Sequence, residues 1–205
     1  TKVTMPESLE VIKQAAFAHC YGLTEIVLGK NVHTLEYDAF YRCNNMTSFT
    51  LSEKLTPETV NDSVVGGSEK LTTLYVPATA EYAPPSLYRH SALENIFVID
   101  EAGNRDALGV AYFSSDGVLF SADGTTLIQI PTAKQITEYA IPETVTVIGE
   151  RAAYDHKYLQ SVSIPSGVTE IGRYAFEYCD ELSLIMAIGC NPETIGSSAL
   201  DANDN

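Results

Sequence analysis

The stretch IPETVTVIGERAAYDHKYLQSVS, residues 141–163, is followed directly by IPSGVTEIGRYAFEYCDELSLIM, residues 164–186. The two align position by position, and Pro165 follows Pro142 after a step of 23 residues. A fixed period of this length is typical of repeat proteins, in which one unit cannot bury its own apolar edge and stacks on its neighbours. The sequence therefore predicts a solenoid.

The same period recurs near the start of the chain. MPESLEVIKQAAFAHCYGLTEIV at residues 5–27 is followed by LGKNVHTLEYDAFYRCNNMTSFT at residues 28–50, so that Phe17 matches Phe40. A third copy begins near Leu51 and a fourth near residue 76, both without the Ala-Phe pair, and a last fragment restarts the pattern up to residue 200. We expect the array to continue, or to be capped, beyond residue 205. The start at a threonine indicates a removed targeting segment or a cut from a longer chain.

Each unit has two halves with different periodicity. In the tail, Ser161 and Ser163 alternate with Val162 and Ile164, the pattern of a short strand with one buried face. In the first half, the apolar positions recur at spacings of three to four, which predicts one or two helical or 3₁₀ turns. The expected fold class is an α/β repeat solenoid.

The period breaks between residues 100 and 131. Asp123-Gly124 lies there between two alternating apolar runs, a strong signal for a β-hairpin, although a surface loop with chance alternation is the alternative. We therefore expect one solenoid domain with an N-terminal block of about four copies (1–99), an irregular segment with a hairpin insert (100–131), and a C-terminal block of two full copies and a partial one (132–205).

Composition excludes several classes of function. The chain has 205 residues with 12 Lys and Arg against 27 Asp and Glu, a net charge of −15 that repels nucleic acid. No apolar run reaches the roughly 18 residues of a membrane-spanning helix. No nucleophile elbow, phosphate-binding glycine loop or zinc-ligand spacing occurs, so we predict no catalytic residue, metal or cofactor.

Three of the four cysteines occupy one repeat position, Cys20, Cys43 and Cys179, and Cys190 lies outside it. Cys20 and Cys43 are expected on adjacent repeat units about 5 Å apart, within reach of a disulfide. In-register side chains point the same way, however, and histidine fills this position in other copies. Semi-buried thiols are the favoured interpretation, and the disulfide stays open.

The phrase IPxxVTxIGxxAFxxCxxLxxV, spelled almost intact by residues 164–185 and partly by residues 141–162, resembles the BspA-like bacterial leucine-rich repeats. The segment DGVLFSADGTTLIQIP is similar to a hairpin that often interrupts those arrays. The resemblance implies a curved, right-handed superhelix with a parallel concave sheet. It also implies a secreted or cell-surface protein that binds host proteins, other cells or surface polymers. Because copies three and four and the Arg151-Ala152-Ala153 segment lack the Ala-Phe pair, the sheet is expected to be locally distorted there.

Strand alternation predicts which side chains face outward on the concave sheet. Tyr75 and Phe97 fall on consecutive strands, and aromatic rings beside small polar residues form a plausible contact patch unless the insert covers them. The candidate binding residues are Tyr75, Phe97, Thr73, Asn95, Thr50, Ser48 and Glu25. A non-enzymatic module for protein interaction or adhesion is the first hypothesis. The alternatives are a structural spacer that presents a neighbouring domain, a glycan-binding surface module, and, as the remotest, an unrecognised enzyme.

Overall fold

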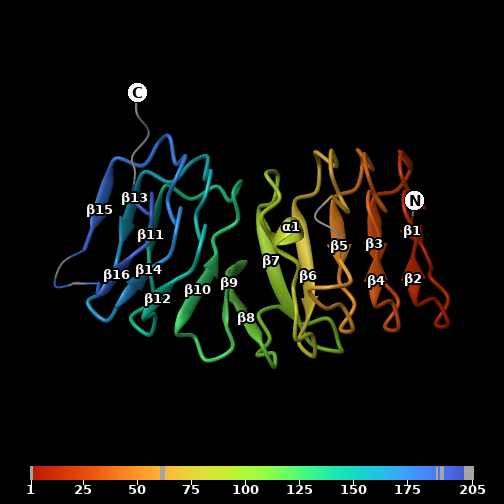
Figure 1. The fold of residues 1–205 in the computed structure, drawn as a ribbon, viewed down its shortest axis with the longest axis horizontal. Coiled ribbons are helices and arrows are strands. Elements are labelled where there is room, and N and C mark those ends of the chain that lie inside the picture. Colours follow the sequence, from red (N-terminus) through yellow and green to blue (C-terminus); the bar gives the residue numbers. More distant parts are fainter. Residues whose placement is uncertain (1, 61–62, 188, 190–191, 201–205) are drawn as a thin grey trace.

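The chain folds into an elongated stack of short strands joined by turns, and the computed structural model describes residues 2–60, 63–187, 189 and 192–200. One repeat unit is called a coil below. The elements are β1 (Lys2–Val3), β2 (Val11–Ile12), β3 (Glu25–Val27), β4 (Thr34–Leu35), β5 (Ser48–Thr50), β6 (Thr73–Pro77), α1 (Pro85–Tyr88), β7 (Asn95–Ile99), β8 (Tyr112–Ser115), β9 (Val118–Ser121), β10 (Thr126–Gln129), β11 (Glu138–Ala140), β12 (Val147–Ile148), β13 (Ser161–Ser163), β14 (Glu170–Ile171), β15 (Leu184–Met186) and β16 (Thr194–Ile195). The stack runs from β1 at one end to β15 and β16 at the other (Figure 1).

The strand tails of the first coils form a parallel five-stranded sheet in the order β1-β3-β5-β6-β7, called the N-terminal sheet below. Its middle side chains, including Ile26, Phe49, Leu74 and Ile96, are fully buried, which is the predicted alternation. The expected distortion at copies three and four is wrong, because β6 and β7 pair in register over five residues each. The strand tail keeps its alternation although the Ala-Phe pair has been lost.

The predicted hairpin is confirmed, and it belongs to a larger unit. β9 and β10 pair antiparallel around Asp123-Gly124, and β8 pairs antiparallel with β9 around Asp116-Gly117. β10 then pairs in parallel with β12, so the insert starts a six-stranded sheet in the order β16-β14-β12-β10-β9-β8. A separate three-stranded sheet, β11-β13-β15, carries the strand tails of the C-terminal coils. The outward face predicted as one sheet is therefore divided in two by the insert.

Among the described residues, the helical turns predicted for the first half of each unit are absent except for α1 in the fourth copy, so the α/β class is wrong and the described chain is a β-solenoid. Within the described residues, the only helix is the four-residue α1. In several coils the apolar positions at three-to-four spacing instead include a second short strand, such as β12 and β14, followed by turns.

Hydrogen bonding between coils explains why these turns are not helical. Arg151 and Asp155 have φ angles of 57° and 54°, a left-handed backbone that interrupts a right-handed helix. The backbone N–H of Ala153 donates to the carbonyl of Ala175 in the next coil at 2.7 Å, instead of to a carbonyl four residues back. Spacing of apolar residues does not distinguish this geometry from a helix.

A column of glycines lets successive coils approach closely. A Cβ atom on Gly172 would lie 2.5 Å from the backbone nitrogen of Glu150, and one on Gly196 would lie 2.4 Å from that of Arg173. A Cβ atom on Gly149 would likewise lie 2.9 Å from the carbonyl oxygen of Leu127, so the backbone contact between coils leaves no room for a side chain at these positions.

Buried side chains form two clusters that meet at β9. The first contains the interior of the N-terminal coils and includes Leu119 of β9. The second contains the interior of the C-terminal coils and includes Val118 and Phe120, the neighbours of Leu119. Alternation along one strand therefore sends adjacent side chains into different clusters.

Candidate functional site

The seven predicted binding residues all lie on the outer face of the N-terminal sheet, and each is half-buried. Parallel pairing places them in two rows that cross the strands. The first row is Glu25, Ser48, Thr73 and Asn95, and the second is Val27, Thr50, Tyr75 and Phe97. The first row is polar, and the second ends in two aromatic rings.

Tyr75 and Phe97 form a stacked pair under an arginine. Their ring centroids are 6.1 Å apart with planes 28° from parallel. The Arg105 guanidinium lies 4.5 Å from the centre of the Phe97 ring and donates a hydrogen bond of 3.0 Å to the Tyr75 hydroxyl. This arrangement combines cation–π attraction with a hydrogen bond and partly covers the rings.

Sequence reasoning missed Arg105, because it lies in the irregular segment after β7 and belongs to no repeat position. The backbone brings it back by a bridge to Ile99, the last residue of β7. Only the basic residue itself, eight positions after Phe97, could have suggested the contact.

The insert covers part of the face at Asn95. A Cβ atom on Gly117, in the β8–β9 turn, would lie 2.6 Å from the side-chain oxygen of Asn95. The Gly117 carbonyl also accepts a hydrogen bond from the backbone N–H of Ile96 at 2.9 Å, and Ser114 Oγ accepts one from Val98 at 2.9 Å. The insert therefore closes the edge of β7, and Asn95 is less available than the other predicted residues.

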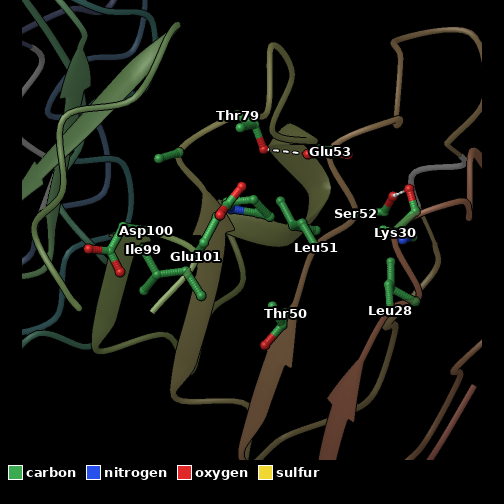
Figure 2. Close-up of a pocket in the computed structure, with 12 residues that line it drawn as sticks. Leu28, Lys30, Thr50, Leu51, Ser52, Glu53, Thr79, Ile99, Asp100 and Glu101 are labelled. Carbon is green, nitrogen blue, oxygen red and sulfur yellow. Dashed lines mark hydrogen bonds between the residues drawn. The ribbon is translucent and has the colours of Figure 1, made fainter. Parts of the chain in front are cut away.

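A hollow of about 360 Å³ lies where β3, β5, β6 and β7 end (Figure 2). Its apolar lining consists of the buried Leu28 and Leu51 with the half-buried Pro77, Ala78 and Ile99. Thr50 lines the hollow and also belongs to the second row, so the hollow and the outer face are continuous. Sequence reasoning missed the hollow, because turns after four different strands build it.

Charged side chains surround the hollow. Glu53, Glu101 and Asp100 contribute carboxylates, and Lys30 contributes an ammonium group that lies 3.9 Å from a carboxylate oxygen of Glu7. Glu53 accepts a hydrogen bond from the Thr79 hydroxyl, which joins the turns after β5 and β6 (Figure 2).

Asp100 is held in its ionised form by its own turn. Its Oδ2 accepts a hydrogen bond of 2.8 Å from the Asn104 amide, and its Oδ1 accepts bonds from the backbone N–H groups of Asn104 and Ala102. The Asn104 side chain, with these backbone groups, holds the pKa of Asp100 below its usual range.

The repeat position shared by three cysteines contributes to the buried interior. Cys43 and Cys179 are buried thiols whose Sγ–H donates to the carbonyls of Phe17 and Ala153 at 3.2 and 2.9 Å. Burial raises the pKa of both thiols to about 11, which keeps them protonated and unreactive. Cys20 is likewise a free thiol, and Cys190 lies outside the described residues.

At the equivalent position, His156 is fully buried, and its Nδ1 accepts a hydrogen bond of 3.1 Å from the backbone N–H of Leu159. Burial, with the Lys134 ammonium nearby, lowers the pKa of His156 to about 4. Among the described residues, no group of three or more His, Cys, Asp and Glu side chains is placed to hold a metal ion. No helix in that part of the chain has the length and apolar character needed to cross a bilayer.

Solved structures of two bacterial proteins share this fold. A leucine-rich repeat protein from Eubacterium ventriosum superposes with a TM-score of 0.55 at 20% identity, covering 85% of this chain and 56% of that one. The pneumococcal vaccine antigen PcpA superposes with a TM-score of 0.52 at 16% identity, covering 92% of this chain and 64% of that one. The chain thus spans less than two thirds of either structure. No match was found among curated proteins.

The family described as the BspA type leucine rich repeat region matches in six copies over residues 1–106 and 132–205. The match leaves out residues 107–131, which contain β8, β9 and β10. Stacked parallel strands, the in-register cysteine position and these six copies point to the same assignment: the chain belongs to the BspA-type leucine-rich repeat family.

Proposed function

We propose that this chain is a non-enzymatic interaction module that binds a protein through the outer face of its N-terminal sheet. The observation that carries the proposal is the pair of in-register rows, which place half-buried polar and aromatic side chains across four strands and lead into the hollow through Thr50. A face of this kind combines aromatic anchors with hydrogen-bonding groups, as protein interfaces do.

Membership of the BspA-type family supports the same proposal, because stacked repeats offer a broad surface for a protein partner. The resemblance of these repeats to exported bacterial proteins supports a secreted or cell-surface site of action, where the module would bind a protein or another surface polymer. Burial keeps the Cys43 and Cys179 thiols protonated and makes the His156 imidazole a weaker base, which argues against a catalytic role for these three residues and supports a role in binding.

Selection from a random peptide library displayed on phage tests the proposal without a known ligand. We expect peptides that bind the immobilised protein and lose most of that binding in the Thr73→Arg variant, because Thr73 lies in the middle of the first row. Gln14→Arg is the matched control, since it adds the same charge at an exposed position outside the N-terminal sheet.

Failure to enrich any peptide would contradict the proposal and favour a structural spacer. Peptides that bind wild type, Thr73→Arg and Gln14→Arg equally would place the binding surface elsewhere. Selective binding of oligosaccharides to the same face, without peptide binding, would favour the glycan-binding alternative.

A further inference from the structure

We propose that the hollow at the ends of β3, β5, β6 and β7 binds a lysine or arginine side chain presented by the protein partner. This inference rests on the proposed function and names the chemistry of the group that the site recognises. Its basis is a confined apolar surface that is continuous with the proposed binding face and is surrounded by carboxylates.

The size and lining of the hollow fit a long side chain with an apolar stem. Neighbouring strands lie about 4.8 Å apart, so the hollow, which crosses the ends of four strands, is about 14 Å long. An extended lysine side chain is shorter than this and can lie within the hollow. A volume of about 360 Å³ is at the lower end for small-ligand sites. Leu51, Pro77 and Ile99 offer apolar surface along which the methylene groups of lysine or arginine can pack while the charged end stays near water.

The charges around the hollow favour a cation. The lining residues include three carboxylates, on Glu53, Glu101 and Asp100, and one ammonium group, on Lys30. Both oxygens of Asp100 accept hydrogen bonds within their own turn, so Glu53 and Glu101 are the carboxylates available to a ligand. The Lys30 ammonium lies 3.9 Å from a carboxylate oxygen of Glu7, which offsets its charge. The net charge of −15 on the whole chain strengthens the attraction of a basic segment at long range.

Other occupants fit less well. An acidic segment would be repelled by these carboxylates, and an uncharged aliphatic side chain would fill the apolar part while removing water from the carboxylates. A sugar ring would need an exposed aromatic face for stacking, but the described residues that line the hollow include no aromatic one. The nearby Tyr75 and Phe97 rings are already covered in part by Arg105.

Nuclear magnetic resonance titration of the ¹⁵N-labelled protein tests the proposal with two small probes. N-acetyl-lysine methylamide carries the ammonium group, and N-acetyl-norleucine methylamide has the same four-carbon stem without it. We expect the lysine probe to shift the amide signals of Thr50, Leu51 and Thr79 and to bind at least threefold more tightly than the norleucine probe. Raising the salt concentration should weaken binding of the lysine probe but not of the norleucine probe, because Glu53 and Glu101 are exposed.

Charge-neutral variants identify the groups responsible. Glu53→Gln combined with Glu101→Gln should weaken the lysine probe by about threefold to tenfold, the range expected for two exposed ion pairs. Glu143→Gln removes one exposed carboxylate in the C-terminal block and should change nothing. Both altered positions of the double variant are exposed, so the dispersion of its amide spectrum should match that of wild type.

Any one of three results would overturn the inference: the two probes bind equally, the shifted signals belong to residues away from the hollow, or the double variant binds the lysine probe as tightly as wild type. If phage selection yields peptides that depend on Thr73 while the lysine probe fails, the proposed function stands and the hollow is not its basic-residue site. If the lysine probe binds in the hollow but no peptide depends on the face, the proposed function fails instead.

Discussion

Replacing Gly172 with alanine tests whether the coils stack as closely as described. The backbone N–H of Gly172 donates to the carbonyl of Ile148 in the preceding coil at 2.7 Å. An added Cβ would lie 2.5 Å from the backbone nitrogen of Glu150 and 2.7 Å from the carbonyl carbon of Gly149. Both atoms belong to the main chain, so neither can rotate away, and the two coils must move apart.

The expected cost follows from this overlap. Overpacking a well-ordered interior destabilises by about 1–3 kcal/mol, and each kcal/mol lowers the melting temperature by about 2–4 °C in a chain of this size. Gly167→Ala is the matched control, because its Cβ would lie 3.9 Å from the carbonyl oxygens of Glu143 and Val145, an ordinary contact. That variant should be neutral or more stable by about 0.4–1 kcal/mol, since alanine restricts the unfolded chain.

Urea unfolding followed by far-ultraviolet circular dichroism gives both free energies of unfolding. Tyrosine fluorescence provides a second probe, because the chain has 12 tyrosines and no tryptophan. Equal stability of the Gly172→Ala and Gly167→Ala variants would refute the close backbone contact, and with it the register between these coils.

Four further predictions concern the interior. Phe176→Ala should cost about 3–5 kcal/mol in urea unfolding as a truncation of a buried side chain; a loss under about 1 kcal/mol would mean that this position is not interior. Because the folded pKa of His156 is about 4 and that of an exposed imidazole is about 6.5, the unfolded state binds the proton more tightly. Burial of neutral His156 therefore leaves the free energy of unfolding undiminished above about pH 6.5 and lowers it by on the order of 3 kcal/mol as the pH drops towards 4. In His156→Cys the free energy of unfolding, measured at a series of pH values, should depend less steeply on pH in this range. An unchanged slope would contradict the assignment. Alkylation of the native protein at pH 8, read by peptide mass spectrometry, should modify Cys43 and Cys179 far more slowly than after denaturation, and equal rates would argue against their burial. Calorimetry should give a single unfolding transition if residues 1–205 are one domain, whereas two transitions would assign a separate domain to each buried cluster.

Much of the outer face could be predicted from the sequence, because strand alternation has a period of two and the repeat has a period of 23. Together they place Thr50, Tyr75 and Phe97 in one row before any coordinates are known. The same reasoning cannot predict the contact of Arg105 or the hollow, which depend on irregular turns. Asp116-Gly117 carries the same hairpin signal as Asp123-Gly124, so the β8–β9 turn could have been predicted from the sequence, whereas its contact with Asn95 could not.

The wrong expectation of helical turns has a clear physical origin. A spacing of three to four apolar residues reports which side chains point inward, but not where the backbone N–H groups find acceptors. In this solenoid the neighbouring coil supplies acceptors, as for Ala153 and Ala175, and left-handed residues such as Arg151 and Asp155 aim the chain towards them. Which carbonyl group accepts each of these hydrogen bonds becomes visible only when two neighbouring coils are placed side by side in a structure.

The position of β9 between two buried clusters has an evolutionary consequence. Duplicating one 23-residue unit within either block would lengthen the molecule by about 4.8 Å and give each strand beside the new unit a parallel partner equivalent to the one it had. No such duplication is neutral at β9, because Leu119 and Phe120 serve interiors on opposite sides of the strand. Relatives should therefore gain and lose units in the N-terminal and C-terminal blocks, while the insert that contains β8, β9 and β10 stays constant in length.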